Sequence, residues 1–498
     1  MNPLITWAAD VTGRLENDCA PSDGPLTVAA PVQTALEEDC APSDGPLYGF
    51  DFKRPAAAGT TPSQTLMKIA PQLYTAPLPH NFTLAYSPFS PAGPVVLNQP
   101  AVRRLYAFTT PEPLDQAVDY TLAQGGLLVA AGQKPTLTRG HPLTLTAWLH
   151  LTNACNLDCP YCYVHKSNER MSEEIGLKAV EAVFRSAEKN GFKAVKLKYA
   201  GGEAALHFKL MQRLHRYAQH LATKKGLDLR AVVLSNGTVW TAAMARWLVD
   251  AGIKLMISLD GVGATHDAQR PDRGGRGTFA RIEHTVDHIL LPAGVRPDIS
   301  ITITGRNAFA AADAVAWAIE RDLPFSLNFY RENLLSASYQ DLKLEESQII
   351  EGMRRAYRVV EKQLPARPFL GGLLDRVQVE AHTHTCGVGQ SYMVFTHTGQ
   401  VAQCQMHLGD GKTFNRADDP LKLVTQGSIP VISVDDKEGC KECIWRYRCT
   451  GGCPLETFRA TGRFDVQSPH CNIYRTLFPE ALRLEGLRLM KLGGYLSC

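Results

Sequence analysis

The chain has 498 residues, of which 45% are hydrophobic and 20% are charged, and its formal net charge is +3. This length exceeds one compact core and predicts about two to four domains, and the balanced charge gives no general case for a nucleic-acid-binding or membrane-surface protein. No apolar run of about 18 residues and no signal-peptide pattern occur, so we expect a cytosolic protein without a transmembrane helix. In that compartment the 13 cysteines favour metal or redox chemistry over disulfides.

The N-terminal segment, residues 1–55, is an acidic tail that contains a repeat. Residues 15–26 read LENDCAPSDGPL and residues 36–47 read LEEDCAPSDGPL, which places Cys19 and Cys40 at equivalent positions. Two copies are too few for a solenoid. The acidic composition, rich in proline, glycine and serine, predicts a segment without fixed structure in isolation.

A linker at 55–63 leads into a small patterned block at 70–138. The stretches NFTLAYSPFS and GPVVLNQPAVRRLYAF predict strands followed by a helix from about Gln99. The stretch LDQAVDYTLAQGGLLVAAG predicts a further helix and a short strand. Together they indicate a domain of roughly 70 residues.

Strand and helix patterns alternate over residues 143–335. Six apolar or alternating runs recur: LTLTAWLHLT, KAVKLKYAGG, LRAVVLSNG, IKLMISLDG, DISITITG and PFSLNFY. The alternation predicts an α/β fold with a parallel sheet covered by helices, and such sheets place their chemistry at the carboxyl ends of the strands. A helical bridge at 336–385, a cysteine-rich module at 386–480 and a C-terminal helix or tail at 481–498 complete the predicted organisation.

Three cysteines lie on one loop directly after the first of these strands. Residues 152–163 read TNACNLDCPYCY, so that Cys155, Cys159 and Cys162 have the spacing C-x3-C-x2-C. Three thiolates on one loop can hold three irons of a [4Fe–4S] cluster and leave the fourth iron to a ligand from outside the protein. A zinc site would need a fourth ligand, for which His165 is the candidate, but the surrounding strands favour the cluster.

This pattern resembles the radical S-adenosylmethionine (SAM) enzymes. The resemblance implies a partial (β/α)6 barrel whose cluster binds SAM through the SAM amino and carboxylate groups. It also implies reductive cleavage of SAM to a 5′-deoxyadenosyl radical, which abstracts hydrogen from a substrate. By the same resemblance, the ends of the following strands carry the residues that bind SAM: Gly201, Gly202, Glu203, Ser235, Asn236, Ser258, Asp260 and Arg270.

The family assigns a different part of SAM to each of these motifs. In YAGGEAAL, the backbone of the two glycines and the side chain of Glu203 are expected at the SAM amino group, because glycine lets the backbone approach a ligand closely. LSNGT and ISLDG are expected to line the ribose and methionine region, and ITITG the adenine. Arg270 is expected to pair with the SAM carboxylate.

Seven cysteines in the C-terminal part resemble the SPASM module that follows many radical SAM barrels and binds two auxiliary [4Fe–4S] clusters. The resemblance assigns four of them to one cluster: Cys440, Cys443, Cys449 and Cys471. It assigns the other three to the second cluster: Cys386, Cys404 and Cys453. That cluster lacks a fourth ligand, and the position is either open or filled by Cys498, a histidine such as His397, or a substrate thiol.

The same resemblance bears on the substrate. Relatives that mature sulfatases carry an aspartate as a catalytic base directly after the second SPASM cysteine, where this chain has Gln405. The block at 70–138 resembles the winged-helix-like peptide-recognition domain of ribosomal-peptide maturases, in which a leader peptide adds a strand to a sheet edge. The alternative is an N-terminal cap on the barrel that binds nothing.

The function that we expect is therefore maturation of a ribosomally made peptide by hydrogen abstraction and formation of a C–S thioether or C–C cross-link. The expected partners are a precursor peptide and an electron donor such as flavodoxin or ferredoxin. Two alternatives stay open: another SPASM oxidation of a protein residue, and a metal-stapled peptide-binding protein without catalysis. The repeat with Cys19 and Cys40 is either substrate-like or a tandem duplication in a tail, and the sequence names no general base.

Overall fold

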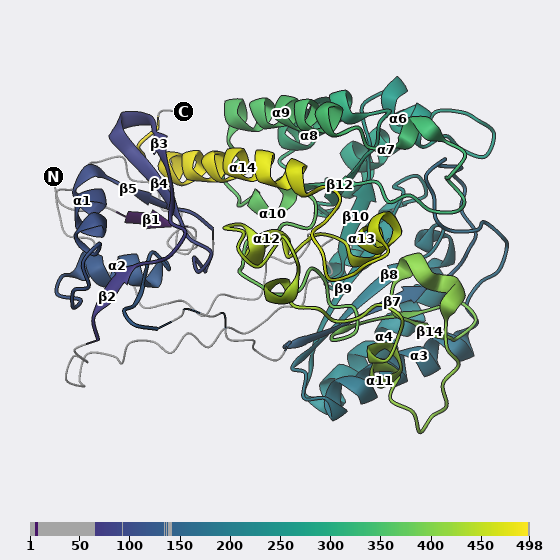
Figure 1. Ribbon diagram of the computed structural model, residues 1–498. Helices are drawn as coiled ribbons and strands as arrows, with labels where there is room; N and C mark the ends of the chain where they lie inside the picture. Colours follow the sequence, from purple (N-terminus) through teal and green to yellow (C-terminus); the bar gives the residue numbers. More distant parts are fainter. Residues whose placement is uncertain are drawn as a thin grey trace.

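The computed structural model describes residues 5–7, 65–91, 93–133, 135, 137 and 142–496. The repeats with Cys19 and Cys40, the linker at 55–63 and Cys498 lie outside the described residues. The molecule consists of a small N-terminal module and a larger α/β body, joined along one long helix (Figure 1). No helix in the described ranges is long and apolar enough to cross a membrane.

An eight-stranded sheet forms the centre of the body, in the order β12-β11-β10-β9-β8-β7-β13-β14. The six strands from β7 to β12 follow one another in chain order and are parallel. They are β7 (Thr144–His150), β8 (Ala194–Ala200), β9 (Asp228–Ser235), β10 (Lys254–Ser258), β11 (Asp298–Ile303) and β12 (Phe325–Phe329). Each forms from one of the six predicted runs, which confirms the α/β fold with a parallel sheet.

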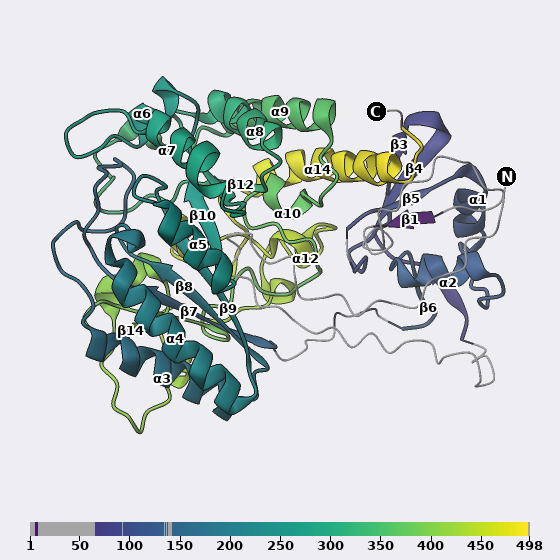
Figure 2. The ribbon, with the colours of Figure 1, turned by 180° about the vertical axis from the view of Figure 1, so that it is seen from behind.

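Helices cover the outer face of this sheet, as Figure 2 shows from behind. They are α3 (Glu173–Lys189), α4 (Phe208–Lys225), α5 (Ala242–Asp250), α6 (Ala264–Gln269), α7 (Phe279–Thr285) and α8 (Ala311–Glu320). The start of α3 illustrates the local cause, since the Ser172 hydroxyl accepts a hydrogen bond from the Ile175 N–H and so caps the first turn. The buried face of α3 then packs Val180, Val183 and Phe184 into the main core.

The cysteine-rich module extends the same sheet, which the sequence did not predict. Strand β13 (Tyr392–Phe395) pairs parallel with β7, and β14 (Val401–Ala402) completes a hairpin. Three short helices belong to the same module: α11 (Pro420–Thr425), α12 (Arg446–Cys449) and α13 (Pro454–Thr461). Cys386 precedes β13 and Cys404 follows β14, so the two cysteines flank the hairpin that lies beside β7.

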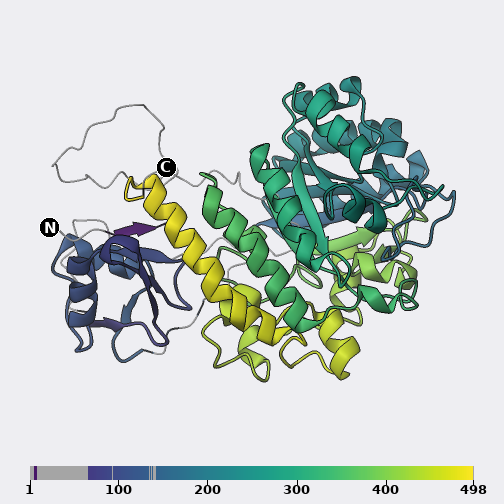
Figure 3. The same ribbon diagram turned by 90° about the horizontal axis from the view of Figure 1, so that it is seen from above.

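Two long helices pack together in the body, and the second of them continues to the N-terminal module. Helix α9 (Glu346–Gln363) forms within the predicted helical bridge, followed by α10 (Leu370–Leu373). Helix α14 (Cys471–Leu492) packs beside α9 and continues to the N-terminal module (Figure 3). At a rise of about 1.5 Å per residue, α14 spans roughly 33 Å between its two ends.

The N-terminal module contains the strands and helices that the sequence predicted. Its two helices are α1 (Gln99–Ala107) and α2 (Ala117–Gln124). A four-stranded antiparallel sheet has the order β1-β5-β4-β3, and β2 pairs with β6. The strands are β1 (Ile5–Trp7), β2 (Met67–Ile69), β3 (Tyr74–Leu78), β4 (Phe82–Tyr86), β5 (Val95–Leu97) and β6 (Leu128–Ala130). The sequence did not predict β1, because it lies in the acidic tail. The predicted domain boundaries remain predictions.

Candidate cofactor and metal sites

The first cysteine loop leaves the carboxyl end of β7 and is hydrogen-bonded to the end of the neighbouring strand β8. The Gly202 N–H donates to the Thr152 carbonyl at 2.7 Å, and the Glu203 N–H donates to the Ala154 carbonyl at 2.9 Å. A Cβ atom at Gly201 would lie 2.5 Å from the Thr152 carbonyl oxygen, and one at Gly202 would lie 2.4 Å from that of Ala154. Both glycines are therefore required by the close approach of the cysteine loop itself.

The three cysteines of this loop are half-buried. Burial raises the pKa of the Cys159 thiol to about 12, and burial also raises the pKa of Cys155. The Asn236 side-chain amide donates to the Cys155 sulfur at 3.7 Å. A metal converts such thiols to thiolates, and the hydrogen bond from Asn236 would then stabilise the negative charge on one of them.

Glu203 is completely buried and connects the ends of β8 and β9. Its carboxylate accepts hydrogen bonds from the Ala205 N–H (3.0 Å), the Ser235 hydroxyl (2.8 Å) and the Asn236 N–H (2.6 Å). Burial raises the pKa of Glu203, while these three donors favour its charged form. Glu203 thus positions two other predicted SAM residues, Ser235 and Asn236, against the cysteine loop.

Asn236 and Asn156 form a second link between the end of β9 and the loop. The Asn236 side chain donates to the Asn156 side-chain oxygen at 2.8 Å, and the Asn156 amide donates to the Thr238 hydroxyl at 2.7 Å. The sequence interpretation missed Asn156, although its place directly after Cys155 was the available signal. Asn156 therefore acts as a positioning residue for the loop.

Asp260 and Arg270 form a buried ion pair at the end of β10. The Arg270 Nε lies 2.7 Å from an Asp260 carboxylate oxygen, and the other oxygen accepts from the Thr302 N–H at 2.8 Å. The Tyr161 hydroxyl, from the cysteine loop, also donates to Asp260, and the Arg270 guanidinium lies over the Tyr161 ring. Both carboxylate oxygens of Asp260 are thus engaged by the protein. The predicted contacts of Asp260 and Arg270 with SAM stay predictions, as does that of the half-buried Ser258 at the end of β10.

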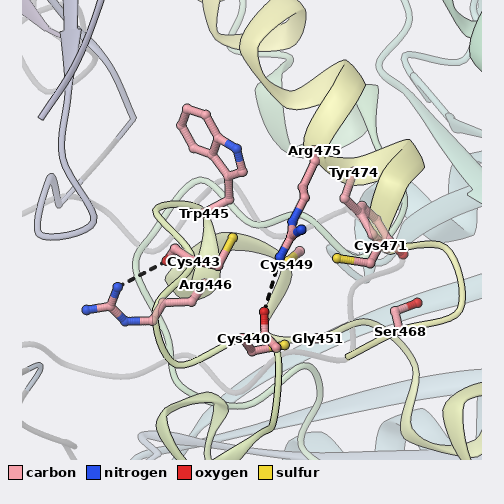
Figure 4. Close-up of a pocket in the computed structure, with 11 residues that line it drawn as sticks. Cys440, Cys443, Trp445, Arg446, Cys449, Gly451, Ser468, Cys471, Tyr474 and Arg475 are labelled. Atoms are coloured by element: carbon pink, nitrogen blue, oxygen red, sulfur yellow. Dashed lines mark hydrogen bonds between the residues drawn. The ribbon is translucent and has the colours of Figure 1, made fainter. Parts of the chain in front are cut away.

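Four cysteines of the C-terminal module line one cavity (Figure 4). They are those that the resemblance assigns to one cluster: Cys440, Cys443, Cys449 and Cys471. Trp445, Tyr474 and Arg475 complete much of the wall. Burial raises the pKa of Cys449 to about 12 and that of Cys440 to about 11.

The other three module cysteines pack against a second, smaller apolar cluster of side chains. They are Cys386, Cys404 and Cys453, and their partners include Val388, Met406 and Phe464. Directly after Cys404, the Gln405 side-chain oxygen accepts a hydrogen bond from the Tyr392 hydroxyl at 2.8 Å. A carboxamide cannot take up a proton as a carboxylate does, so Gln405 is not a general base.

One candidate for the missing fourth ligand has other partners. The His397 Nε2 lies 3.5 Å from a carboxylate oxygen of Glu169, and the His397 ring packs 5.9 Å from that of His150. His397 therefore faces the loop that follows β7. Within the described ranges, no three His, Cys, Asp or Glu side chains converge on one point as the ligands of a single ion would.

Residues 149–307 match the model of the Radical SAM superfamily, over the strands and the cysteine loop described above. The chain contains a radical SAM domain. The strand order, the position of the C-x3-C-x2-C loop and this match together confirm the resemblance. A [4Fe–4S] cluster and SAM are the cofactors that membership of this superfamily implies.

Three curated relatives extend the similarity beyond this radical SAM domain. An AdoMet-dependent heme synthase from Oleidesulfovibrio alaskensis is 26% identical over 70% of this chain and 92% of its own length. A cysteine-type anaerobic sulfatase-maturating enzyme from Clostridium perfringens is 25% identical over 61% of this chain and 86% of its own. The sporulation killing factor maturation protein SkfB from Bacillus subtilis is 29% identical over 35% and 39%.

Among solved structures, native anSMEcpe with bound AdoMet and the Cp18Cys peptide matches with a TM-score of 0.56 at 20% identity. The match covers 69% of this chain and 99% of that one. At this identity the likeness concerns the fold, and it agrees with the parallel sheet described above.

The residues present fit the cofactors that the radical SAM superfamily implies. Cys155, Cys159 and Cys162 provide three sulfur ligands from one loop, as a [4Fe–4S] cluster with one open iron requires. Such a cluster binds each thiolate at a different iron, so its ligands need not converge on one point as zinc ligands do.

Proposed function

We propose that this radical SAM enzyme matures a ribosomally made peptide, by removing hydrogen from a peptide carbon and forming a C–S thioether or C–C cross-link. Cys155, Cys159 and Cys162 would hold a cluster that, with SAM bound and an electron from a donor such as flavodoxin or ferredoxin, would supply the 5′-deoxyadenosyl radical. In this proposal the eight residues inferred from the family bind SAM: Gly201, Gly202, Glu203, Ser235, Asn236, Ser258, Asp260 and Arg270.

The observation that carries the proposal is the attachment of the N-terminal module to the loop with the auxiliary cysteines. Arg448, directly before Cys449, is completely buried and donates to the Tyr86 hydroxyl at 3.1 Å and to the Ser90 carbonyl. Trp445 packs on the rings of Tyr74 and Tyr86, at 5.2 and 5.4 Å. A module that accepts a peptide strand would thereby be fixed to the loop that carries three of the auxiliary cysteines, Cys440, Cys443 and Cys449.

The proposal includes three [4Fe–4S] clusters. Cross-linking removes two protons and two electrons in all: one of each goes as a hydrogen atom to the 5′-deoxyadenosyl radical, and the other proton and electron leave the substrate separately. The cavity lined by Cys440, Cys443, Cys449 and Cys471 offers four sulfur ligands for a cluster that takes up this electron. The site of Cys386, Cys404 and Cys453 offers three, which leaves one iron open to a substrate thiol or another ligand.

A second candidate is oxidation of a protein residue, as the name of the sulfatase-maturating relative describes. The coverage of 86% of that relative favours this candidate. The carboxamide of Gln405 argues against this second candidate, because the relatives that mature sulfatases are expected to have a catalytic aspartate at this position.

The test is anaerobic reconstitution followed by reaction with SAM, dithionite and candidate precursor peptides. We expect about twelve irons per chain, 5′-deoxyadenosine, and a peptide that has lost two hydrogens. Peptide mapping by mass spectrometry locates the bond and also examines residues 8–49 of the chain itself.

The matched control replaces Cys155, Cys159 and Cys162 by alanine. It should hold about eight irons and form no 5′-deoxyadenosine. Bound zinc, or clusters that never cleave SAM, would show a metal-stapled binding protein. Oxidation of one residue without a new bond would favour the second candidate.

A further inference from the structure

The N-terminal strand β1 closes the edge of the sheet in the N-terminal module. It pairs antiparallel with β5, with Ile5 opposite Leu97, Thr6 opposite Val96 and Trp7 opposite Val95. Strand β4 occupies the other side of β5. Without β1, the backbone N–H and C=O groups on this side of β5 would be an unpaired edge.

The edge that β1 fills lies against two helices. Both α2 and α14 contact β1, and α14 also contacts β5 and β3. All three residues of β5 are buried, with at most 2% of their surface exposed. A strand at this place is therefore held by the module on one side and, on the other, by the helix that begins at Cys471 (Figure 3).

The segment after β1 begins and ends at this module. Strand β2, which follows it, starts at Met67 and pairs with β6 of the same module. The duplicated phrases at 15–26 and 36–47 lie in the sequence between the two strands. The chain between β1 and β2, which contains both cysteine phrases, is therefore attached to the module at each of its two ends.

We propose that the edge of β5 is a binding site for one extended peptide strand, and that its occupant in this chain is the chain's own segment, residues 5–7. Main-chain pairing accepts different side chains, so this segment and the strand of a separate peptide compete for the same N–H and C=O groups. The chain thus carries a built-in equivalent of a leader, followed by two copies of the cysteine phrase. The proposal rests on the proposed function in one respect, that the module recognises peptides.

Covalent attachment gives the built-in strand an advantage over a separate peptide. A tethered segment has an effective concentration of up to the order of millimolar, which decreases as the connecting chain lengthens. A free peptide at micromolar concentration therefore binds only when β1 has left β5.

Binding of a labelled peptide tests the proposal. The probe is fluorescein-labelled MNPLITWAAD, residues 1–10 of the chain, with a scrambled peptide as control. We expect a variant that lacks residues 2–9 to bind this probe at least roughly tenfold more tightly than the full chain, and not to bind the scrambled peptide. Fluorescence anisotropy measures the affinity for the probe on the reconstituted protein without SAM or reductant. A lack of probe binding can therefore be distinguished from a lack of catalysis.

Two substitutions at one position test the pairing itself. Proline lacks an N–H and fixes φ near about −65°, whereas an antiparallel strand has φ near about −140°, so Thr6→Pro should disrupt β1, increase hydrogen exchange of the β5 amides that face it and allow the probe to bind. Thr6→Ala keeps the N–H and should change neither measurement.

Three results would overturn the assignment. Equal affinity of the full and truncated chains for the probe would show that β1 does not occupy the binding site, and so would unchanged exchange of β5 in Thr6→Pro. A truncated chain that dimerises and ignores the probe would assign the edge to a second copy of the chain.

Discussion

Buried polar side chains stabilise each of the two cysteine-bearing regions, the first cysteine loop and the C-terminal module. Around the first loop, the Glu203 carboxylate accepts from the Asn236 N–H, and the Asn236 side chain donates to the side-chain oxygen of Asn156 in the loop. Around the auxiliary site, one buried cation, Lys437, lies near cysteines of both predicted sets. At both places the charge is compensated by short, defined contacts, because an uncompensated charge at such depth is costly.

Replacing Glu203 by glutamine should weaken both SAM binding and stability. The three hydrogen-bond partners of this carboxylate all donate hydrogen, and a glutamine amide would turn an NH₂ group toward at least one of them. We expect a loss of about 1–3 kcal/mol in the free energy of unfolding and weaker SAM affinity by calorimetry. Glu174→Gln, at an exposed pair with Lys178, is the control, and an equal effect of both variants would contradict the argument.

Replacing Lys437 by methionine should lower the reduction potentials of the two proposed auxiliary clusters. The Lys437 ammonium is buried, donates to the Thr450 carbonyl at 3.0 Å, and interacts electrostatically with Cys440 and Cys386. A nearby positive charge favours the reduced, more negative cluster. An interaction of about 1 kcal/mol corresponds to a shift on the order of 50 mV for one electron.

Potentiometric titration followed by electron paramagnetic resonance measures these potentials. Lys441→Met, on the exposed part of the same loop, is the matched control and should shift neither auxiliary potential. A potential that stays unchanged in Lys437→Met would show that this charge is screened from both clusters.

At the scale of the elements, the end of β12, the residues after α10 and the start of α14 meet at one carboxylate. Asp375 is buried and accepts from the Phe329 N–H at 3.1 Å, the Arg331 guanidinium at 2.5 and 2.9 Å, and the Tyr474 hydroxyl at 3.2 Å. Burial by itself would raise the pKa of Asp375, but the Arg331 guanidinium outweighs it and lowers the pKa below the usual 3.8.

The pKa of Asp375 predicts how stability depends on pH. A carboxyl whose pKa is lower in the folded than in the unfolded state stabilises the fold above the unfolded value, and this contribution is lost as the pH falls through the folded one. We therefore expect Asp375→Asn to destabilise the protein at pH 7 and the difference from wild type to shrink below about pH 4.

Urea unfolding at a series of pH values measures this difference. Asp250→Asn, at an exposed carboxyl at the end of α5, should show no such convergence. A difference between Asp375→Asn and wild type that is independent of pH would mean that packing, and not the charge, sets its effect.

At the scale of the whole molecule, the N-terminal module supports the proposed auxiliary site, the cavity lined by Cys440, Cys443, Cys449 and Cys471, as well as strand β1. Arg448 and Trp445 lie between Cys443 and Cys449 in the chain, and both pack on the module. Helix α14 carries Cys471 at its start, and Gly486, farther along, lies against Leu78 and Leu84 of the module. The loop and the helix that carry the proposed ligands of the auxiliary cluster are thus both anchored to the module.

A chain that begins at residue 139 should therefore lose iron as well as peptide binding. Without the module, the loop from Cys440 to Cys449 lacks its packing partners, and we expect about four of roughly twelve irons to be lost. Iron analysis after anaerobic reconstitution measures this, with a variant that lacks residues 8–63 as the control that keeps the module. Full iron content in the shorter chain would show that the auxiliary site folds independently.

Much of the fold was predictable because its determinants are local. The six strand runs and the helical periodicities between them predict a parallel sheet, and each run forms a strand. The cysteine spacing predicted a loop at the end of the first strand, where Cys155, Cys159 and Cys162 lie. The pairing of β13 with β7 joins segments more than 200 residues apart, and no local pattern signals it.

By itself the sequence determined the α/β architecture, the radical SAM domain and the sets of candidate ligands, because residue spacing and periodicity are properties of the chain. Only the tertiary structure decided that Gly201 and Gly202 make room for the cysteine loop, that Asp260 pairs with Arg270, and that β1 occupies the edge of β5. These contacts depend on which surfaces meet after the elements pack. A three-residue strand in an acidic tail has too little local signal to predict its partner.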